Sequence, residues 1–286
     1  MPDFEPISFL TPAKINFYLL IQSKRQDGYH ELVMDLIPVS VFDRIRLSPS
    51  DSGRVELRTN LPGVNQEDNL IIKAIRLLEK EAGKKFSLSI ELDKKIPWGA
   101  GLGGGSGNAA GTLVMANRLL RLNIPDDRLS LLALSLGADV PFFLNPRPSL
   151  AEGIGERLTV LQRFDPINLL LVYPGFPVST KLAYSICNKS KRQRLLHHYS
   201  LDEFRSLTPD NNDFWYPLVE RYPQLKVTRE TILKQGALFS GLSGSGSTLF
   251  GVFPDEETRN KAYSNLFEKN DWKVFKCETL PEYKYE

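Results

Sequence analysis

One stretch of the sequence has residue types that suit a phosphate group. Residues 97–111 read PWGAGLGGGSGNAAG and contain seven glycines. Glycine permits positive φ angles and lets backbone N–H groups approach a ligand closely. A helix is predicted from Asn108 onward, and unpaired N–H groups at a helix N-terminus attract phosphate. The stretch therefore indicates a phosphate-binding loop, with a flexible surface loop as the alternative.

This loop matches neither of the common phosphate motifs completely. A P-loop, GxxxxGK[ST], needs a lysine after the glycines, and none follows here. Gly99, Gly101 and Gly104 fit GxGxxG, but a dinucleotide-binding fold also needs an acidic residue about twenty positions further on. Residues 111–123 predict a continuing helix instead.

Length and composition limit the other possibilities. With 286 residues, the chain can form one large domain or two ordinary ones, without disulfides or structural metals. A net charge of +2 argues against nucleic acid or a membrane as the main partner. Cys187 and Cys277 form no CxxC motif, and we expect both thiols to pack as small hydrophobes in a reducing compartment. The N-terminus lacks signal-peptide features, and no run approaches about 20 apolar residues, so we expect a cytoplasmic protein.

Periodicity predicts an α+β first half that positions the loop. Strands are expected at 8–21, 31–38, 43–48 and 86–92, with a turn at 26–28. Helices are expected at 69–82, from Asn108 to about Leu122, and at 126–136, the first closed by Gly83 and the last by Gly137. This half is expected to end near residue 150.

The second half, residues 151–286, begins again with a strand at 167–172. Helices are expected near 212–221 and 226–235, then a Gly/Ser loop that leads into a strand within 240–253, then a final helix and strand. Basic residues dominate 188–206; a solvated connecting segment is the favoured interpretation and a nucleic-acid patch the alternative.

The glycine loop resembles the second of three motifs of the GHMP kinases, a family named for galactokinase, homoserine, mevalonate and phosphomevalonate kinases. Residues 12–16, PAKIN, resemble the first motif, and the third is resembled by Ser243, Gly244, Ser245, Gly246 and Ser247. The three motifs stand in the family's order and span most of the chain. The resemblance implies an α+β, two-domain fold with the active site in the interdomain cleft.

Three further segments narrow the resemblance to one branch of the family, whose substrate is a cytidine-diphosphate-linked polyol. They are residues 27–32 (DGYHEL), 136–143 (LGADVPFF) and 212–214 (NDF), beside the triple glycine of GLGGGS. The branch usually carries a second serine after Ser106, where this chain has Gly107. The substitution removes one hydroxyl from a place where phosphate or metal contact would be expected.

The resemblance also assigns the phosphate donor, ATP with Mg²⁺, to the first domain. The implied ATP-binding residues are Pro97, Gly99, Gly101, Gly103, Gly104, Gly105 and Ser106, flanked by Asn69 and Lys94. The metal is expected to be held mostly by phosphates and water, and no protein ligand is identified.

Lys14 and Asp139 are the catalytic residues that the resemblance implies, and their chemistry agrees with it. Phosphoryl transfer needs positioning, charge neutralisation and an oriented hydroxyl. Asp139 can accept the hydroxyl proton, and a nearby Lys14 would keep its carboxylate ionised. Considered alone, Lys14 also fits a strand lysine that points to solvent, and Asp139 fits a turn former after Gly137.

The substrate end is assigned by resemblance alone. Tyr29 and His30 are expected to grip the cytosine by stacking and hydrogen bonding, Thr180 and Tyr184 to close the pocket, and Asn16 to orient the substrate. Without the resemblance, Tyr29 and His30 would fit a half-buried surface pair.

The sequence thus predicts a kinase for a CDP-linked polyol, acting on small molecules as a monomer or homodimer, without nucleic-acid or membrane partners. One alternative is a GHMP kinase of the homoserine or mevalonate type. Another is a non-catalytic metabolite sensor on the same scaffold. The Tyr29–His30 pair favours a substrate with a base, and a sensor would have no need for both Lys14 and Asp139.

Overall fold

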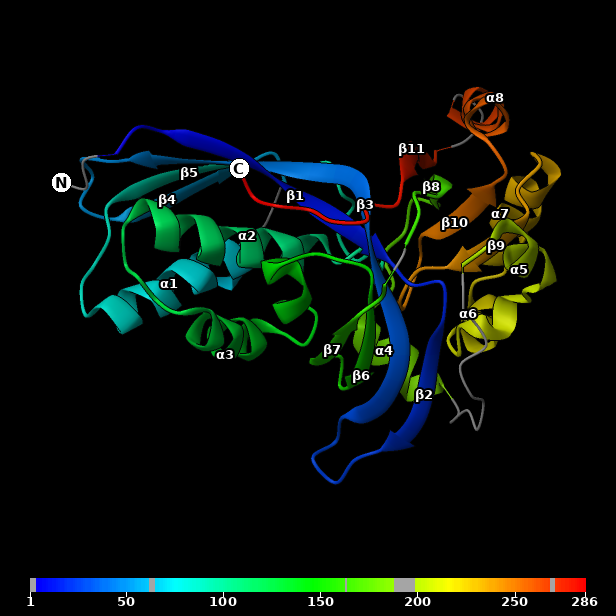
Figure 1. Ribbon diagram of the computed structural model, residues 1–286, viewed down its shortest axis with the longest axis horizontal. Helices are drawn as coiled ribbons and strands as arrows, with labels where there is room; N and C mark the ends of the chain where they lie inside the picture. The colour runs from blue at the N-terminus through cyan, green and yellow to red at the C-terminus, as the bar shows by residue number, and fades with distance from the viewer. Residues whose placement is uncertain (1–3, 62–64, 163, 188–198, 268–270) are drawn as a thin grey trace.

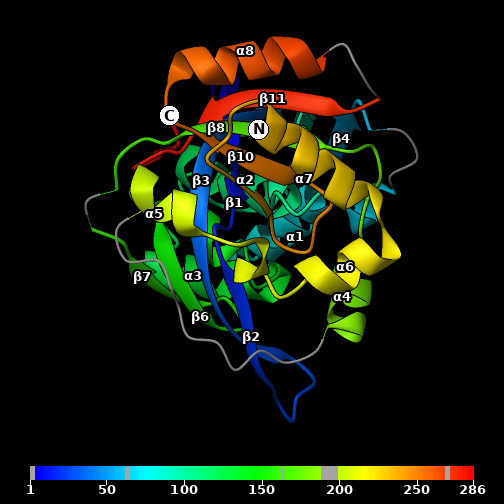
Figure 2. The same ribbon diagram turned by 90° about the vertical axis from the view of Figure 1, so that its right-hand side faces the viewer.

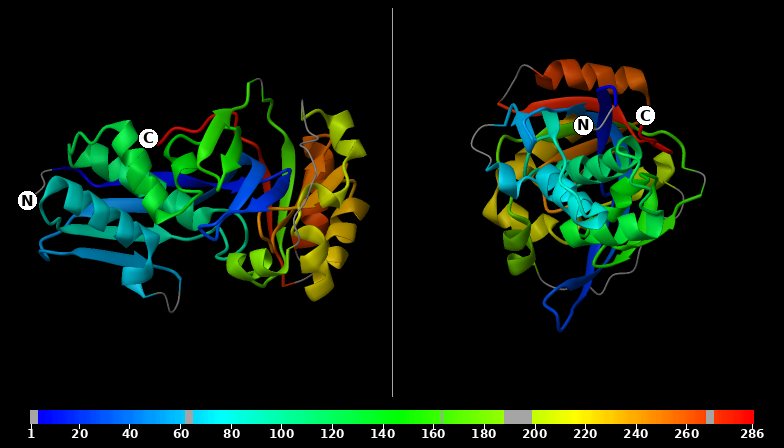
Figure 3. Two further views of the ribbon diagram at one scale, coloured as in Figure 1. Left: turned by 90° about the horizontal axis from the view of Figure 1, so that it is seen from below. Right: turned by 90° about the vertical axis from the view of Figure 1, so that its left-hand side faces the viewer.

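The computed structural model describes residues 4–61, 65–162, 164–187, 199–267 and 271–286. The described chain forms an elongated molecule with a larger lobe at one end and a smaller lobe at the other (Figures 1 and 3). None of its described helices has the length and apolar character that crossing a membrane requires. Most of the basic segment at 188–206 lies outside the described residues; its described end contains α5 (Leu201–Ser206).

The larger lobe is built on a mixed sheet of seven strands. The path β4-β5-β3-β6-β7 is completed by β1 and β2, which both pair with β3. The strands are β1 (Ile7–Ile15), β2 (Leu19–Lys24), β3 (His30–Pro49), β4 (Val55–Thr59), β5 (Leu88–Asp93), β6 (Ser149–Gly153) and β7 (Arg157–Val160).

Strand β3 is 20 residues long, so the prediction of two separate strands at 31–38 and 43–48 was wrong. Its first part pairs with β2 and β6 and its second part with β1 and β5. Opposite the step from Pro12 to Ala13, two extra residues, Ser40 and Val41, form a bulge in β3. A bulge bends a strand without ending it, and the bend is visible in Figure 1.

The single strand expected at 8–21 was also wrong, because the chain leaves the sheet between β1 and β2. Buried Asp35 in β3 holds this break: its carboxylate accepts from the Tyr18 N–H at 3.2 Å, and its backbone carbonyl accepts from the Asn16 amide. Both strands pair with β3 on either side of the break, Ile15 with Ile37 and Leu19 with Met34. The turn expected at 26–28 is confirmed, and it closes a hairpin that projects from the body (Figure 2).

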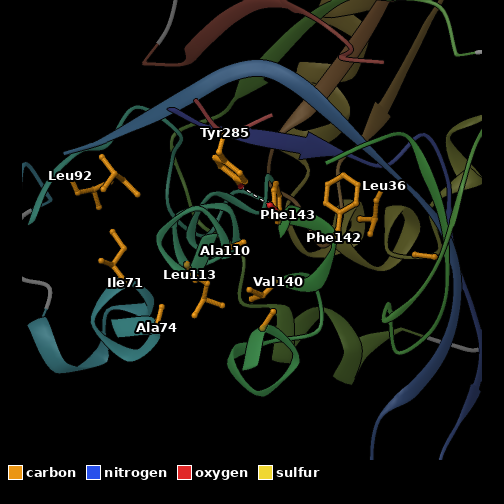
Figure 4. Packing of buried hydrophobic residues seen from close by; sticks show 14 of the residues in the cluster. Leu36, Ile71, Ala74, Leu92, Ala110, Leu113, Val140, Phe142, Phe143 and Tyr285 are labelled. Atoms are coloured by element: carbon orange, nitrogen blue, oxygen red, sulfur yellow. Dashed lines mark hydrogen bonds between the residues drawn. The ribbon is translucent and has the colours of Figure 1, made fainter. Parts of the chain in front are cut away.

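Three helices cover one face of the larger sheet (Figure 1). Helices α1 (Leu70–Ala82) and α3 (Asp126–Leu136) confirm the sequence prediction, with Asn69 capping α1 and Gly83 ending it at a φ of 62°. Helix α2 (Gly104–Leu119) begins four residues before the predicted start at Asn108. Its glycines allow close packing on β1: a Cβ at Gly111 would lie 2.7 Å from Thr11 Cγ2. Figure 4 shows the core between these layers.

The smaller lobe has a four-stranded antiparallel sheet in the order β11-β8-β10-β9. Its strands are β8 (Asn168–Tyr173), β9 (Phe239–Leu242), β10 (Leu249–Phe253) and β11 (Lys273–Glu278). Helices α7 (Gln224–Lys234) and α8 (Glu256–Phe267) pack against it. Helices α4 (Thr180–Ile186) and α6 (Trp215–Arg221) contact each other, with α4 on the side of the larger lobe (Figure 1). The predicted strand at 167–172 and the final helix and strand are confirmed.

The two lobes share a hydrophobic core. It joins the β1–β3 region to the smaller sheet and includes Ile15, Phe17, Leu171, Phe250 and Cys277. Cys277 is therefore buried as expected, whereas Cys187 is only partly buried. Residue 150, where the domains were expected to part, lies within β6, and the first sheet continues to the end of β7.

Candidate active site

A cavity of about 630 Å³ opens where the two lobes meet. Its walls are the glycine loop, the end of β1, the β2–β3 hairpin, the start of α4 and the loop between β9 and β10. Most of the sequence-predicted site residues line it: Lys14, Tyr29, His30, Lys94, Pro97, Gly99, Gly101, Gly103, Gly104, Gly105, Ser106, Asp139, Thr180, Tyr184, Gly244 and Ser245. The lobes thus bring segments from across the whole chain to one place.

The glycine loop turns into α2 directly at the cavity. Gly103 precedes the helix with a φ of 67° and has no side chain to cap it, so the first N–H groups of α2 have no capping partner in their own helix. Gly105 faces the cavity, and a Cβ placed there would meet only Leu70 Cδ1, at 3.6 Å. This arrangement offers backbone donors and the positive end of a helix dipole to an anion.

A buried ion pair lies beneath this helix start. Lys94 binds the carboxylate of Asp43, and both side chains are almost completely buried. Asp43 also accepts hydrogen bonds from Asn108 Nδ2 at 2.9 Å and from the backbone N–H of Ile96 at 2.8 Å. Burial lowers the pKa of Lys94, and the charge of Asp43 partly offsets this. The pair fixes an ammonium group beside the N-terminus of α2, where it can face a phosphate.

Lys14 and Asp139 lie close together in the wall of the cavity. Lys14 Nζ lies 4.0 Å from Asp139 Oδ2, with the lysine side chain 5% and the aspartate side chain 34% exposed. Lys14 Nζ also donates to Asn16 Oδ1 at 2.8 Å. The solvent-facing alternative for Lys14 is therefore excluded. Burial lowers the pKa of Lys14, whereas the negative charges of Asp139 and Asp35 raise it.

Asn16 lies behind Lys14 instead of on the described cavity lining. Its amide oxygen accepts from Lys14 and its amide nitrogen donates to the carbonyl of Asp35. The structure thus places Asn16 where it can hold the ammonium group of Lys14 in position. Asp35 and Asp43 were not predicted as site residues; the signal that the sequence offered was an acidic residue within the apolar pattern of a strand.

The far end of the cavity is aromatic. The rings of His30 and Tyr184 stack with centroids 4.9 Å apart and planes 16° apart, and Phe214 packs edge-on against Tyr184. Tyr29 is 58% exposed at the rim. Thr180 Oγ1 lies 3.1 Å from Ser245 Oγ, which links α4 to the loop between β9 and β10. Burial raises the pKa of Tyr184, so its phenol stays neutral. This end suits a planar ring with polar edges.

The third-motif loop, residues 243–247, is interlocked with the glycine loop. Ser243 Oγ donates to the carbonyl of Gly101 at 3.0 Å, and a Cβ at Gly101 would lie only 2.1 Å from the carbonyl oxygen of Ser243. Asn212 Nδ2 donates to the carbonyls of Leu242 and Gly244, both at 2.9 Å. Ser243 and Gly246 are outside the described lining of the cavity, and Ser243 fastens its loop to the glycine loop.

Two other predicted positions also lie outside the described lining. The side chain of Asn69 caps α1 by accepting from the Ile71 N–H at 2.9 Å. A side chain at position 107 would point at β1, since a Cβ there would lie 2.9 Å from the carbonyl oxygen of Pro12. In this backbone, a hydroxyl at position 107 would not face the cavity.

Trp98, which was not predicted from the sequence, lines the cavity and is 70% exposed.

Comparison with known proteins agrees with this architecture. The family model described as GHMP kinases N terminal domain matches residues 69–146, and GHMP kinases C terminal matches residues 194–271. A 4-diphosphocytidyl-2-C-methyl-D-erythritol kinase from Geobacter sp. (strain M21) is 38% identical over 271 residues, covering 93% of this chain and 96% of the relative.

Solved structures give the same result. A crystal structure of 4-(cytidine 5'-diphospho)-2C-methyl-D-erythritol kinase superposes with a TM-score of 0.80 at 31% identity, covering 96% of this chain and 100% of that chain. Homoserine kinase from Cytophaga hutchinsonii ATCC 33406 shares the fold at 20% identity, with a TM-score of 0.69 over 100% of this chain and 99% of that chain. The chain therefore belongs to the GHMP kinase family, within the branch of the 4-diphosphocytidyl-2-C-methyl-D-erythritol kinases.

Proposed function

We propose that this protein transfers the γ-phosphate of ATP to the 2-hydroxyl of 4-diphosphocytidyl-2-C-methyl-D-erythritol, in the non-mevalonate route to isoprenoid precursors. One observation carries the proposal: a single cavity joins an uncapped helix start, a buried lysine beside a carboxylate, and an aromatic end. The helix start suits a triphosphate, the lysine and carboxylate suit a reacting hydroxyl, and the aromatic end suits a cytosine ring. Membership of the family supports a kinase that uses ATP.

The proposed chemistry takes place between Asp139 and Lys14. The carboxylate of Asp139 accepts the proton of the 2-hydroxyl, whose oxygen forms a bond to the γ-phosphorus while the bond to the β–γ bridging oxygen breaks. Lys14, 4.0 Å from the carboxylate, neutralises charge that develops near the transferred group. Asn16, which accepts a hydrogen bond from Lys14, holds the ammonium in place.

The phosphates of ATP are proposed to lie over the start of α2. Backbone donors of Gly104 and Gly105 and the ammonium of Lys94 face this position. Among the described residues, no three acidic, histidine or cysteine side chains gather into a metal site. The hydroxyl of Ser106 lines the cavity at the helix start and would be available to a Mg²⁺ ion held mainly by phosphates and water. When bound, the ion would neutralise phosphate charge.

The cytosine of the acceptor is proposed to bind at the aromatic end, against Tyr29, His30 and Tyr184. Stacking of a base on an aromatic ring is worth about 1–3 kcal/mol. A substrate without a base, such as homoserine or mevalonate, would leave this end unused. We further propose that the protein works in the cytoplasm as a monomer or homodimer on free small molecules.

A coupled ADP-release assay tests the proposal, with the cytidylylated polyol, mevalonate and homoserine offered at equal concentrations. Turnover with the cytidylylated polyol, at least a hundredfold above the other two, is the expected result. Preference for mevalonate or homoserine would overturn the substrate assignment. Binding of ATP and CDP by calorimetry without ADP release from any acceptor would instead support a metabolite sensor.

A further inference from the structure

The last residues of the chain return from the smaller lobe and lie across the larger one (Figures 1 and 3). After β11, the N–H of Leu280 donates to the carbonyl of Pro38 at 2.8 Å, and the N–H of Tyr283 donates to the carbonyl of Pro146 at 3.0 Å. The hydroxyl of Tyr283 donates to the carbonyl of Leu10 at 2.8 Å. Residues 279–286, here called the C-terminal strap, therefore tie β11 to the layer that carries the site.

Tyr285 is the buried end of this strap. Its hydroxyl donates to the carbonyl of Phe143 at 2.6 Å, a bond drawn in Figure 4. Its ring packs edge-on against Phe9, and its own carbonyl accepts from Arg118 of α2 at 3.2 Å. Burial raises the pKa of the phenol well above its usual value, so the hydroxyl remains a neutral donor.

Phe143 connects this hydrogen bond to the active site. It belongs to the short 3₁₀ helix η2 (Pro141–Leu144), which begins two residues after Asp139. The terminal carbonyls of such a helix lack partners within it, and Tyr285 supplies one. The Phe143 ring lies under the glycine loop: a Cβ at Gly103 would lie 2.8 Å from Phe143 Cζ and 3.0 Å from Lys14 Cγ.

The position of Phe143 thus affects three parts of the site together. Its ring lies against the turn at Gly103 that starts α2, close to the aliphatic part of Lys14. Its backbone follows directly on the segment that carries Asp139. Protein interiors are packed too closely for such a ring to shift without moving its neighbours. Tyr285 is not among the described residues that line the cavity, and its hydroxyl bonds Phe143, so removal of that hydroxyl acts on the reaction through Phe143.

We propose that Tyr285 is a positioning residue of the kinase. Its hydroxyl holds Phe143 and thereby sets the alignment of Lys14, Asp139 and the glycine loop. The proposal rests on the proposed function of the same cavity. It gives the C-terminal strap a role in turnover, in addition to joining the lobes.

Tyr285→Phe tests the proposal, because it removes one oxygen and keeps the ring. We expect kcat to fall roughly tenfold, since a misplacement of about 1 Å can cost roughly 10²-fold. The KM of the cytidylylated polyol and the Kd of CDP should stay within twofold. The alkaline limb of kcat/KM should move to lower pH, because a more distant Asp139 raises the pKa of Lys14 less.

Tyr283→Phe is the matched control. It removes a hydroxyl of the same strap that bonds Leu10, not η2, so it should lower thermal stability comparably while kcat and the pH profile stay unchanged. Equal kinetics in the two variants, with comparable losses of stability, would reduce Tyr285 to a structural role and overturn the proposal.

Hydrogen exchange of residues 140–146, measured by mass spectrometry, separates this inference from the proposed function. Exchange should quicken in Tyr285→Phe and not in Tyr283→Phe, whichever substrate the enzyme uses. Unchanged exchange in Tyr285→Phe would overturn the positioning role. Failure of the wild type to phosphorylate the cytidylylated polyol, with quickened exchange in Tyr285→Phe, would overturn the proposed function alone.

Discussion

Lys14 is a buried ammonium group, and burial of an unpaired charge is costly. Two carboxylates and one amide oxygen compensate for it: Asp139 at the cavity, Asp35 behind it and Asn16 in direct contact. The resulting group is cationic but loses its proton more readily than an ordinary lysine, because burial is the largest influence on its pKa. Its charge state should therefore be visible in the pH dependence of the reaction.

Asp35→Asn should move the alkaline limb of kcat/KM to lower pH. The charge of Asp35 raises the pKa of Lys14, so its removal lets Lys14 deprotonate earlier as the pH rises. Asparagine keeps an acceptor for the Tyr18 N–H, which limits structural damage. Steady-state rates over an alkaline pH series measure the shift, with the remote surface variant Asp255→Asn as the control. A limb that stays in place or moves to higher pH would contradict the electrostatic role.

Asp139→Asn should lower kcat by about 10²-fold or more, the usual contribution of a positioned base. Binding of ATP and CDP should be retained, because the amide has nearly the same shape and the two ligands are proposed to bind at other parts of the cavity. Rapid-quench turnover and calorimetry on the same preparation measure both quantities. Turnover within a few-fold of the wild type would mean that Asp139 is not the base and that orientation alone drives the transfer.

At the scale of elements, the start of α2 combines two uses of glycine. Gly104 faces inward, where a Cβ would lie 2.7 Å from Lys94 Nζ and 2.8 Å from Ile96 Cγ2. Gly105 faces the cavity, with room for a methyl group beside Leu70. The first glycine permits the packing of the helix on the loop that follows β5, and the second leaves room for the proposed approach of a phosphate.

Gly105→Ala should weaken ATP binding roughly tenfold, the loss of one or two phosphate hydrogen bonds at about 1 kcal/mol each. Stability should hold or rise slightly, because alanine favours a helix over glycine by about 0.5–1 kcal/mol. Gly104→Ala is the comparison variant and should lower both stability and ATP affinity. Thermal melts and ATP titrations decide between them; unchanged ATP affinity in Gly105→Ala would show that the phosphates bind elsewhere.

Helices were predicted better than strands because their signals are local. Asn69 marks the start of α1, Gly83 marks its end, and Gly137 marks the end of α3. Each of these residues lies directly next to the helix that it bounds. The break after β1 depends on Asp35, 19 residues from Asn16, and the continuity of β3 depends on a bulge opposite Pro12. Such long-range pairings leave no local pattern.

The site residues show the same distinction. The three motifs, together with the DGYHEL, LGADVPFF and NDF segments, contain most of the residues that line the cavity. Three residues outside the cavity lining contact or influence the lining residues or their neighbours, and none of them belongs to a motif. They are Asp35 near Lys14, Asp43 bound to Lys94, and Tyr285 bonded to Phe143. Trp98 was not predicted because it occupies the second position of the motif, which can hold any residue in the family pattern.

At the scale of the whole molecule, polar bonds and a shared apolar core hold the lobes together around the cavity. Asn212 is buried and bridges to the carbonyls of Leu242 and Gly244, while Asp213 accepts from the Ile21 N–H at 2.7 Å. The NDF segment thus binds the third-motif loop on one side and β2 on the other. Ser243 then joins that loop to Gly101. Both ends of the cavity depend on this connection.

Asn212→Ala should therefore loosen the cavity as a whole. Two buried carbonyls lose their donor, which we expect to lower the free energy of unfolding by about 1–3 kcal/mol. The KM values of ATP and of the cytidylylated polyol should both rise, because Gly244 and Ser245 line the cavity and Gly101 belongs to the glycine loop, where the phosphates of ATP are proposed to bind. Denaturant unfolding and steady-state kinetics on the same sample measure the two effects.

Asn211→Ala provides the matched control for that variant. Asn211 is the preceding residue and equally buried, but its Nδ2 finds no hydrogen-bond partner among the described residues. Its truncation removes the same side chain without releasing the carbonyls of the third-motif loop. We expect its KM values to stay within twofold of the wild type. If both variants raise KM equally, or if Asn212→Ala loses stability while both KM values stay unchanged, then the NDF segment stabilises the fold without shaping the cavity.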